Sequence, residues 1–278
     1  MFFLATRFVA GVSLPEAVHV VEQLNQKKIK ASLDLLGEDV KNSFEAMQAA
    51  QDYIEILNTI KLKNLASGAS LKLTQMGLDL GKDFCLDNMR KVLTVAKNNE
   101  QFVRIDMEGS AHTQVTLDIF ETLHQEFSKH VGIVLQAYLH RSLADLERVC
   151  AFGGSVRVCK GAYKELPGLA YQNMQDIRNN YKAMVERLSK SNCHFALATH
   201  DDALISWAKT HLAALPKEKF EFQMLYGLRS KTALSLAQEG YRMRVYVPYG
   251  SHWFPYFYRR LRERKENVFF ILRNLFTR

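Results

Sequence analysis

Short apolar stretches alternate along the chain with longer segments in which apolar residues recur every three or four positions. The short stretches are rich in Val, Ile, Leu and aromatic residues, a composition typical of β-strands. Eight are present, at residues 31–36, 69–74, 102–107, 132–138, 155–160, 194–199, 220–225 and 243–248. The longer segments have the periodicity of amphipathic helices, clearest at residues 38–63 and 172–190. The pattern predicts eight strand–helix units.

Eight such units favour a single architecture. Alternation of strands and helices with few hairpin turns indicates a parallel sheet, and eight repeats favour its closure into a (β/α)8 TIM barrel. A Rossmann-type open sheet is the alternative, but no GxGxxG motif follows any predicted strand. Because no linker or low-complexity segment marks a boundary, we expect one α/β domain over residues 1–278.

The two faces of the predicted strands differ in polarity. Side chains alternate in direction along a strand, so one set faces the helices and the other faces the barrel axis. The helix-facing set is apolar, as Val103, Ile105, Val156 and Val158 illustrate. The inward set is polar, and its charged members are mostly cations; it contains Lys72, Thr74, Arg104, Asp106, Arg157, Gln223, Arg244 and Tyr246.

Charged side chains inside a barrel are costly unless they are paired or bind a ligand. A charged ligand is one explanation for the inward set, and a network of structural ion pairs at the barrel floor is the other. Several polar and site-lining candidates fall near the C-terminal ends of their strands, where barrel enzymes have their active sites: Asp106, Lys160, Thr199, Leu225 and Tyr246. The excess of cations favours a ligand with phosphates or a carboxylate.

Two strand ends carry candidate phosphate ligands. The segment VRVCKGAYK ends a strand in Lys160 and Gly161, so a ligand could approach the backbone beside a positive charge. The segment ALATHDD places Thr199 and His200 just before a helix that an aspartate could cap. A phosphate site and a simple capping cluster both explain this segment. A metal site is disfavoured because His200 has no HxH or HxxxH partner.

Composition and charge narrow the classes of protein. The chain is 47% hydrophobic and 24% charged, which is ordinary for a globular protein. No apolar stretch approaches the roughly 20 residues that span a bilayer, and no basic region precedes the apolar N-terminus as a secretory signal requires. The four cysteines form no CxxC pair, which favours reduced thiols. We therefore expect a cytoplasmic protein.

The net charge of +8 is concentrated near the C-terminus. Residues 254–278 contain seven basic and two acidic residues, a net of +5. The segment YFYRRLRERKEN is helical in pattern, with Arg259 and Glu263 on one face. It is either a solvated surface helix or a carboxylate clamp in which Glu263 holds one guanidinium of Arg259 and Arg260. Nucleic-acid binding is not favoured, because no RNP-like or helix-turn-helix signature is present.

In combination, these segments resemble the proline dehydrogenase family, whose members are FAD-dependent barrel enzymes that oxidise L-proline to Δ1-pyrroline-5-carboxylate. Nine segments fall in the family's order, one at nearly every strand end: SLDLLGE, SLKLTQMGLDL, RIDMEGS, LQAYL, VRVCKGAYKE, ATHDD, FEFQMLYGLR, VYVPYG and YRRLRERKEN. The chain is most similar to the monofunctional bacterial form, which lacks an aldehyde-dehydrogenase domain. The resemblance implies an eighth helix displaced inward over the barrel mouth.

The resemblance also implies a role for each residue of the substrate site. The residues that would contact proline are Lys72, Asp106, Tyr163, Leu225, Tyr246, Arg259, Arg260 and Glu263. Lys72 and the two arginines would bind the carboxylate, and Glu263 would orient the arginine pair. The ring of Tyr246 would pack against proline and crowd a 4-hydroxyl group, which favours proline over hydroxyproline. Arg157, Asp106 and Tyr246 would be the catalytic group.

Non-covalent FAD is the implied cofactor. The residues that would bind it are Gln136, Arg157, Lys160, Gly161, Ala162, Thr199, His200, Leu225 and Arg260. Arg157 would lie near flavin N5 and Gln136 would hydrogen-bond to the flavin ring, while Lys160, Thr199 and His200 would hold the phosphates and the adenosine end. Lys164 departs from the pattern, since many relatives have an aromatic residue near the adenine.

The implied reaction is hydride transfer from proline C5 to flavin N5, and electrons then pass to ubiquinone or another membrane quinone. No residue is assigned as a general base. The C-terminal segment NVFFILRNLF either packs against the barrel or makes a peripheral contact with the inner face of the cytoplasmic membrane. Two other classes remain open from the residues alone. One is a flavin-free barrel aldolase or lyase that binds a phosphorylated substrate and forms a Schiff base at Lys160; the other is a non-catalytic ligand-binding protein.

Overall fold

Eight parallel strands form one closed barrel, in which each strand pairs with its neighbours in the sequence and β8 pairs with β1. The computed structural model describes residues 5–263, except for the side chains of Arg259 and of residues 261–263. The strands are β1 (Lys30–Leu35), β2 (Ser67–Leu71), β3 (Val103–Ile105), β4 (Val131–Gln136), β5 (Ser155–Cys159), β6 (Phe195–Ala198), β7 (Phe220–Leu225) and β8 (Met243–Tyr249). The predicted barrel and its eight strands are confirmed.

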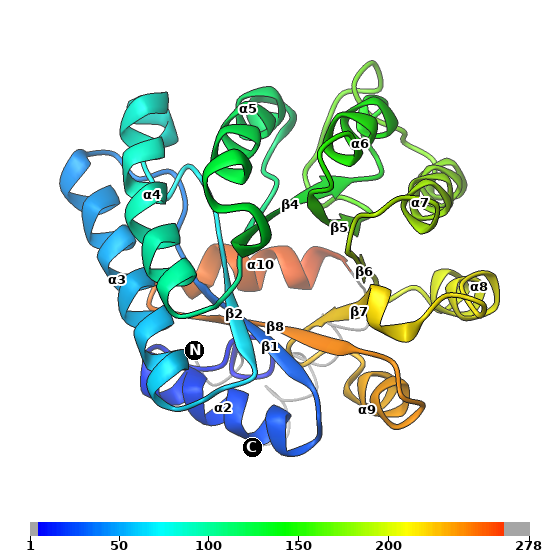
Figure 1. Ribbon diagram of the computed structural model, residues 1–278, viewed down its shortest axis with the longest axis horizontal. Coiled ribbons are helices and arrows are strands. Elements are labelled where there is room, and N and C mark those ends of the chain that lie inside the picture. Colours follow the sequence, from blue (N-terminus) through cyan, green and yellow to red (C-terminus); the bar gives the residue numbers. More distant parts are fainter. Residues whose placement is uncertain (1–4, 264–278) are drawn as a thin grey trace.

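Helices cover the outside of the barrel, as the apolar periodicity predicted (Figure 1). They are α2 (Leu14–Gln26), α3 (Ser43–Leu62), α4 (Lys82–Asn98), α5 (Ser110–Phe127), α6 (Ser142–Cys150), α7 (Met174–Ser189), α8 (Asp202–His211), α9 (Ser230–Gln238) and α10 (Trp253–Glu263). In Figure 1, α10 crosses the barrel instead of joining the outer ring. Helix α2 packs against β1 and β8 and so covers the outer face where the chain closes on itself.

The core lies between the strands and the outer helices. Helix-facing residues such as Leu33, Leu71, Ile105, Ile133 and Val158 are completely buried in one continuous apolar cluster. This burial is the main source of stability for the barrel, at about 1.5–3 kcal/mol for each large side chain. Because the apolar core lies outside the strands, the inward-facing side chains are not needed to form it and can be polar.

The second strand differs from its predicted position. The sequence predicted residues 69–74, whereas β2 spans Ser67–Leu71 and the chain turns immediately afterwards. The strand begins with small residues, which do not give the apolar pattern of a strand in the sequence. A Cβ atom at Gly68 would lie 2.6 Å from the carbonyl oxygen of Phe102, so only glycine allows the neighbouring strand to approach. As a result Lys72 lies just beyond the strand, at the C-terminal end of the barrel.

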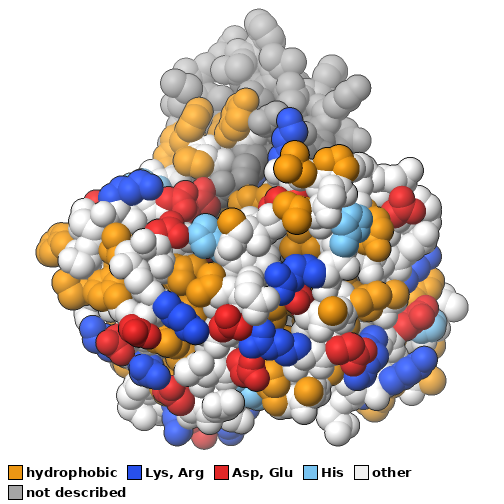
Figure 2. All heavy atoms as spheres, turned by 90° about the horizontal axis from the view of Figure 1, so that it is seen from above, with side chains coloured by type: hydrophobic (Ala, Val, Ile, Leu, Met, Phe, Trp, Pro, Cys, Tyr) orange, Lys and Arg blue, Asp and Glu red, His pale blue; other side chains and the backbone are white. Residues whose placement is uncertain are grey.

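Charge on the molecular surface is mixed. Figure 2 shows basic and acidic side chains interspersed over one face, without a continuous patch of either sign. Within residues 5–263, no helix combines the length and the apolar character needed to cross a membrane. The segment NVFFILRNLF, for which a membrane contact was predicted, lies outside the described residues.

Candidate active site

A chamber of about 670 Å³ lies at the C-terminal ends of the strands, and Tyr256 and Arg260 of α10 form part of its wall. We call it the central chamber. Every predicted site residue whose side chain is described lines it, namely Lys72, Asp106, Gln136, Arg157, Lys160, Gly161, Ala162, Tyr163, Thr199, His200, Leu225, Tyr246 and Arg260. The side chains of Arg259 and Glu263 lie outside the described part of the chain.

Asp106 is the centre of a hydrogen-bonded cluster in this chamber. Its Oδ1 accepts from the Arg157 guanidinium at 2.7 Å and from the Ser70 hydroxyl at 2.8 Å, while its Oδ2 accepts from the Tyr246 hydroxyl at 2.7 Å. The Arg157 guanidinium carbon also lies 5.4 Å from the centre of the Tyr246 ring. Burial, together with the charge of Asp106, raises the pKa of Tyr246 well above its ordinary value, so the phenol stays a hydrogen-bond donor.

Lys72 supplies a buried cation opposite this cluster. Its Nζ lies 3.7 Å from the carboxylate of Asp34, which is completely buried on β1. Burial alone would lower the pKa of Lys72, but the nearby charges of Asp34 and Asp106 raise it above its ordinary value. Lys72 is therefore held as an ammonium group, which suits it to bind a carboxylate.

A second group of polar side chains lies where β5 and β6 end. Lys160 Nζ lies 3.2 Å from Asp201 Oδ2, which also accepts from Arg178 Nε at 2.8 Å. Asp201 caps α8 as well, accepting from the backbone N–H of Ala203 at 3.1 Å. The capping interpretation of this segment is thus confirmed, and the same capping residue fixes the position of Lys160.

His200 is held in one tautomer by the adjacent strand. Its Nε2 accepts a hydrogen bond from the backbone N–H of Leu225 at 3.0 Å, so the ring proton of a neutral imidazole resides on Nδ1. Thr199 Oγ1 accepts from the backbone N–H of Asp201 at 3.1 Å. Both side chains line the central chamber at the N-terminal end of α8, where a helix favours anions.

Gly161 allows close approach to the backbone on the same side. Its φ of +112° lies in a region that favours glycine, and a Cβ atom there would lie 2.2 Å from the ring of Tyr138. The loop after β5 can therefore take this path only with glycine at position 161.

Glu108 was not identified from the sequence, yet it organises the chamber edge. Its carboxylate accepts from the Thr74 hydroxyl at 2.6 Å, and its carbonyl oxygen accepts from the Gln136 side chain at 2.8 Å. Burial raises the pKa of Glu108. Thr74, which was predicted to face the barrel axis, lies in the turn after β2. Its hydroxyl is bonded to Glu108, and it does not line the central chamber.

The other supporting residues that the sequence interpretation missed are Asp34, Ser70 and Asp201. Asp34 lies in the quoted segment SLDLLGE and has the inward parity of its strand, so a signal was present. Ser70 carried no signal, because a serine in a strand is unremarkable until its partner Asp106 is known. Asp201 was weighed only as a helix cap.

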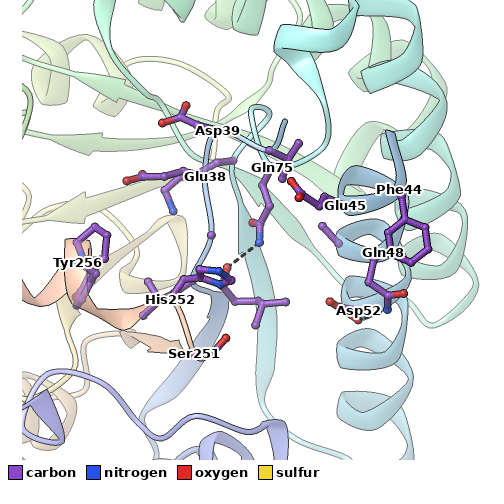
Figure 3. A pocket seen from close by; sticks show the side chains of 17 residues that line it. Glu38, Asp39, Phe44, Glu45, Gln48, Asp52, Gln75, Ser251, His252 and Tyr256 are labelled. Atoms are coloured by element: carbon purple, nitrogen blue, oxygen red, sulfur yellow. Dashed lines mark hydrogen bonds between the residues drawn. The ribbon is translucent and has the colours of Figure 1, made fainter. Parts of the chain in front are cut away.

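A second pocket of about 550 Å³ adjoins the central chamber and shares Lys72 and Tyr256 with it. Figure 3 shows the acidic side chains around it, which are Glu38, Asp39, Glu45 and Asp52. The side chain of Gln75 lines this pocket, and its amide donates to the carbonyl oxygen of Leu35 at 3.1 Å. This acidic lining is less suited to a phosphate group than the side of the central chamber that carries Lys160.

The inward cations do not all belong to one site. Arg104 and Arg244 lie at the N-terminal end of the barrel, in a separate cavity. Arg244 pairs there with Glu221, at 2.7 Å. The alternative of structural ion pairs at the barrel floor is therefore correct for Arg244, whereas Lys72 lines the central chamber and Arg157 lines both cavities.

Comparisons with known proteins agree with this geometry. The family model described as proline dehydrogenase matches residues 17–273. The chain is 41% identical to proline dehydrogenase 1 of Bacillus subtilis over 98% of this chain and 90% of that protein. It is 38% identical to proline dehydrogenase of Deinococcus radiodurans over 99% of this chain and 91% of that one.

A solved structure is similar as well. The crystal structure of proline utilization A (PutA) from Bdellovibrio bacteriovorus, inactivated by N-propargylglycine, superposes with a TM-score of 0.87 and 27% identity. The match covers 94% of this chain and 32% of that larger protein.

Proposed function

The chain belongs to the proline dehydrogenase family, and on that premise we propose that the central chamber holds FAD and L-proline together. The enzyme oxidises proline, the first step of proline catabolism. We propose in addition that the enzyme uses a flavin, that individual residues have the roles given below, and that a quinone accepts the electrons. The observation that carries it is that the expected cofactor and substrate residues with described side chains line one chamber.

The residues of the chamber fit a flavin nucleotide. Lys160, Thr199 and His200 form a basic and hydrogen-bonding side for the phosphates, and Gly161 leaves room for close approach. The Nε atom of Arg157 is buried and has no hydrogen-bond partner among the described residues. Buried donors are normally hydrogen-bonded, so this atom is a candidate donor to a ligand. Gln136, held by Glu108, would face the flavin ring.

Proline would bind between the flavin and α10. Lys72 and Arg260 would hold its carboxylate, with Arg259 and Glu263 proposed to complete the clamp from the same helix. Tyr246 and Leu225 would pack against the ring, and Tyr163 and Asp106 would close its sides. A 4-hydroxyl group would meet Tyr246, which is the basis of the proposed preference for proline.

FAD, when bound, would supply the redox chemistry by accepting a hydride from proline C5 at flavin N5. The protein would orient the C5 atom through the carboxylate clamp and would place the Arg157 charge beside the flavin. Asp106 would fix the guanidinium of Arg157 and the phenol of Tyr246 through the two bonds of 2.7 Å. Arg157 and Tyr246 would therefore already have the correct orientation when the substrate binds.

The decisive experiment is an absorbance spectrum of the purified protein, followed by anaerobic addition of L-proline. Bands near about 380 and 450 nm that bleach with proline would support both cofactor and substrate. A colourless protein that FAD cannot reconstitute would overturn the flavin proposal. A flavin that proline does not reduce would overturn the substrate assignment.

The clamp has its own test. Lys72→Met should raise the KM for proline about tenfold or more, since a charge-assisted hydrogen bond contributes about 1.5–3 kcal/mol. Lys209→Met, which removes a surface lysine paired with Glu239 on the outer helices, is the matched control. Equal KM values in the two variants would exclude Lys72 from the carboxylate site.

We further propose that a membrane quinone such as ubiquinone reoxidises the flavin, with a transient contact between the C-terminal segment and the inner face of the cytoplasmic membrane. Deleting residues 268–278 should then reduce liposome binding and quinone-dependent turnover, while anaerobic reduction by proline is unchanged. Unchanged liposome binding and quinone activity would remove the docking proposal.

A further inference from the structure

A cavity of about 470 Å³ opens at the N-terminal end of the barrel, opposite the central chamber. We call it the lower chamber. Its lining includes residues that begin or immediately precede strands, such as Ser155, His194 and Arg242, and Lys129 lies two residues before β4. A ligand would therefore enter it from the face opposite to α10.

The walls of the lower chamber are strongly cationic. Five basic side chains line it, whereas Glu221 is the one carboxylate on its described walls; the five are Arg104, Lys129, Arg157, Arg242 and Arg244. Glu221 is engaged by Arg244, and the Arg157 charge is matched by Asp106 in the central chamber. No described carboxylate lies within ion-pair distance of Arg104, Lys129 or Arg242, and Arg242 donates to the backbone carbonyl oxygen of Glu218 at 2.6 Å.

Arg104 is the clearest unmatched charge. It is only 3% exposed, and its guanidinium donates to the carbonyl oxygens of Ile133 at 3.0 Å and Ser155 at 2.7 Å, and to the Ser155 hydroxyl at 3.0 Å. Among residues 5–263 no carboxylate lies within ion-pair distance of it, and its Nε atom is buried without a partner. A buried, unpaired charge costs several kcal/mol unless a counter-ion is supplied.

Two groups that line the lower chamber have lowered pKa values, and burial is the first cause of both shifts. Burial, opposed by Glu221 but reinforced by Arg104 and Arg242, lowers the pKa of His194 to about 4. Burial and the adjacent Arg157 charge lower the pKa of Arg104. The Nε2 atom of His194 is also buried without a partner in the described chain, which leaves a second polar group for a ligand.

From the three cations without a described carboxylate partner, the buried Nε of Arg104 and the cavity of about 470 Å³, we infer that the lower chamber is a binding site for a small polyvalent oxyanion, of which inorganic phosphate is the simplest. Arg104, Arg242 and Lys129 provide its charge. The multiple N–H donors of the two guanidinium groups suit an oxyanion.

The lower chamber is separate from the proposed flavin and proline sites. Arg157 and Gln223 line both chambers and form the partition between them. An anion in the lower chamber would therefore lie beneath the catalytic residues without displacing FAD or substrate. The inference does not depend on the identity of the redox cofactor.

Equilibrium dialysis of the FAD-loaded enzyme with radiolabelled inorganic phosphate, at constant ionic strength set with chloride, tests this inference. We expect one saturable phosphate site for each chain. Arg242→Gln should weaken binding about tenfold, as expected for the loss of one charge-assisted hydrogen bond. Lys129→Gln should weaken it in the same direction, and provides a second variant at an exposed position.

Two control variants locate the anion. Arg187→Gln removes an equal charge from the outside of the barrel, where Arg187 pairs with Glu147, and should leave phosphate binding unchanged. Lys72→Met removes a cation of the central chamber and should also leave it unchanged. The inference is overturned by an absence of saturable binding, by equal losses in Arg242→Gln and Arg187→Gln, or by a loss in Lys72→Met that Arg242→Gln does not share.

Discussion

Asp106 and Tyr246 come from strands that lie far apart in the sequence, and their hydrogen bond of 2.7 Å makes them one functional unit. Asp106→Asn should lower kcat/KM for proline about 100-fold, because an amide cannot accept from every donor that now surrounds the carboxylate. Tyr246→Phe should lower it about tenfold by removing one donor. The measurement is the rate of anaerobic flavin reduction by proline.

The double variant distinguishes a shared role from two separate ones. Because the two side chains are in direct contact, the combined loss should be smaller than the product of the single losses. Asp79→Asn, which removes a carboxylate paired with His112 outside the chamber, is the control and should have no effect on kcat/KM. Fully multiplicative losses would show that Asp106 and Tyr246 act independently.

Glu221 illustrates how a buried ion pair links stability to pH. Burial alone would raise its pKa, but Arg244 overrides this and lowers the pKa to about 2 from the ordinary 4.5. A carboxyl with a depressed folded-state pKa contributes stability above pH 4.5 and loses it as pH falls towards 2. Glu221→Gln should therefore cost about 3 kcal/mol at pH 7 and progressively less below pH 4.5.

Urea unfolding of both proteins at several pH values measures this difference. Glu147→Gln is the matched control, since Glu147 forms an exposed ion pair with Arg187, and it should leave stability nearly unchanged. A cost for Glu221→Gln that stays constant down to pH 3 would contradict the assigned pKa.

At the scale of an element, the loop after β5 depends on one glycine. Gly161→Ala adds a Cβ atom 2.2 Å from the Tyr138 ring at a φ of +112°, so we expect a loss of about 3 kcal/mol from backbone strain and overpacking together. FAD affinity should fall with it, because this loop lines the central chamber. Urea unfolding and FAD titration measure the two effects.

Gly153 separates the two causes. Its φ is also positive, at +75°, but a Cβ atom there would meet nothing within 4 Å. Gly153→Ala should therefore show backbone strain alone, about 1–2 kcal/mol, with FAD affinity unchanged. Equal losses in the two variants would mean that contact with Tyr138 contributes nothing.

Helix α10 is the element that completes the site. Tyr256 and Arg260 are 7% and 8% exposed and line the central chamber, although the sequence pattern of this helix is also consistent with a solvated surface helix. The family resemblance, and not the pattern, predicted the correct position. Periodicity identifies an amphipathic helix but does not show against which surface of the protein its apolar face packs.

At the scale of the whole molecule, closure of the barrel depends on the pairing of β1 with β8 over six residue pairs. A fragment of residues 1–239 lacks β8 and would expose the edges of β1 and β7. We expect it to lack cooperative thermal unfolding and a native near-ultraviolet circular dichroism spectrum. The chain without residues 268–278 retains all eight strands and should unfold cooperatively; a cooperative transition in the 1–239 fragment would contradict the need for closure.

The sequence pattern by itself determined the eight strand–helix units, the apolar and polar faces of several strands, and the candidates at the strand ends. Other residues of the central chamber, such as Gln136, followed only from the family resemblance. The features given by the pattern are periodic and local. Alternation along a strand separates Val103 and Ile105 from Arg104 and Asp106 whatever the neighbours are, and the C-terminal end of each strand is known from chain direction alone.

Only the tertiary structure decided which inward residue serves which chamber and which partner each one has. Arg104 lies on β3 and Asp106 immediately follows that strand, about 7 Å further along the chain, yet one lines the lower chamber and the other the central chamber. Height inside a closed barrel depends on the stagger of all eight strands, which no single segment encodes. The pairing of Lys72 with Asp34 is likewise a tertiary contact, because it joins the turn after β2 to the neighbouring strand β1.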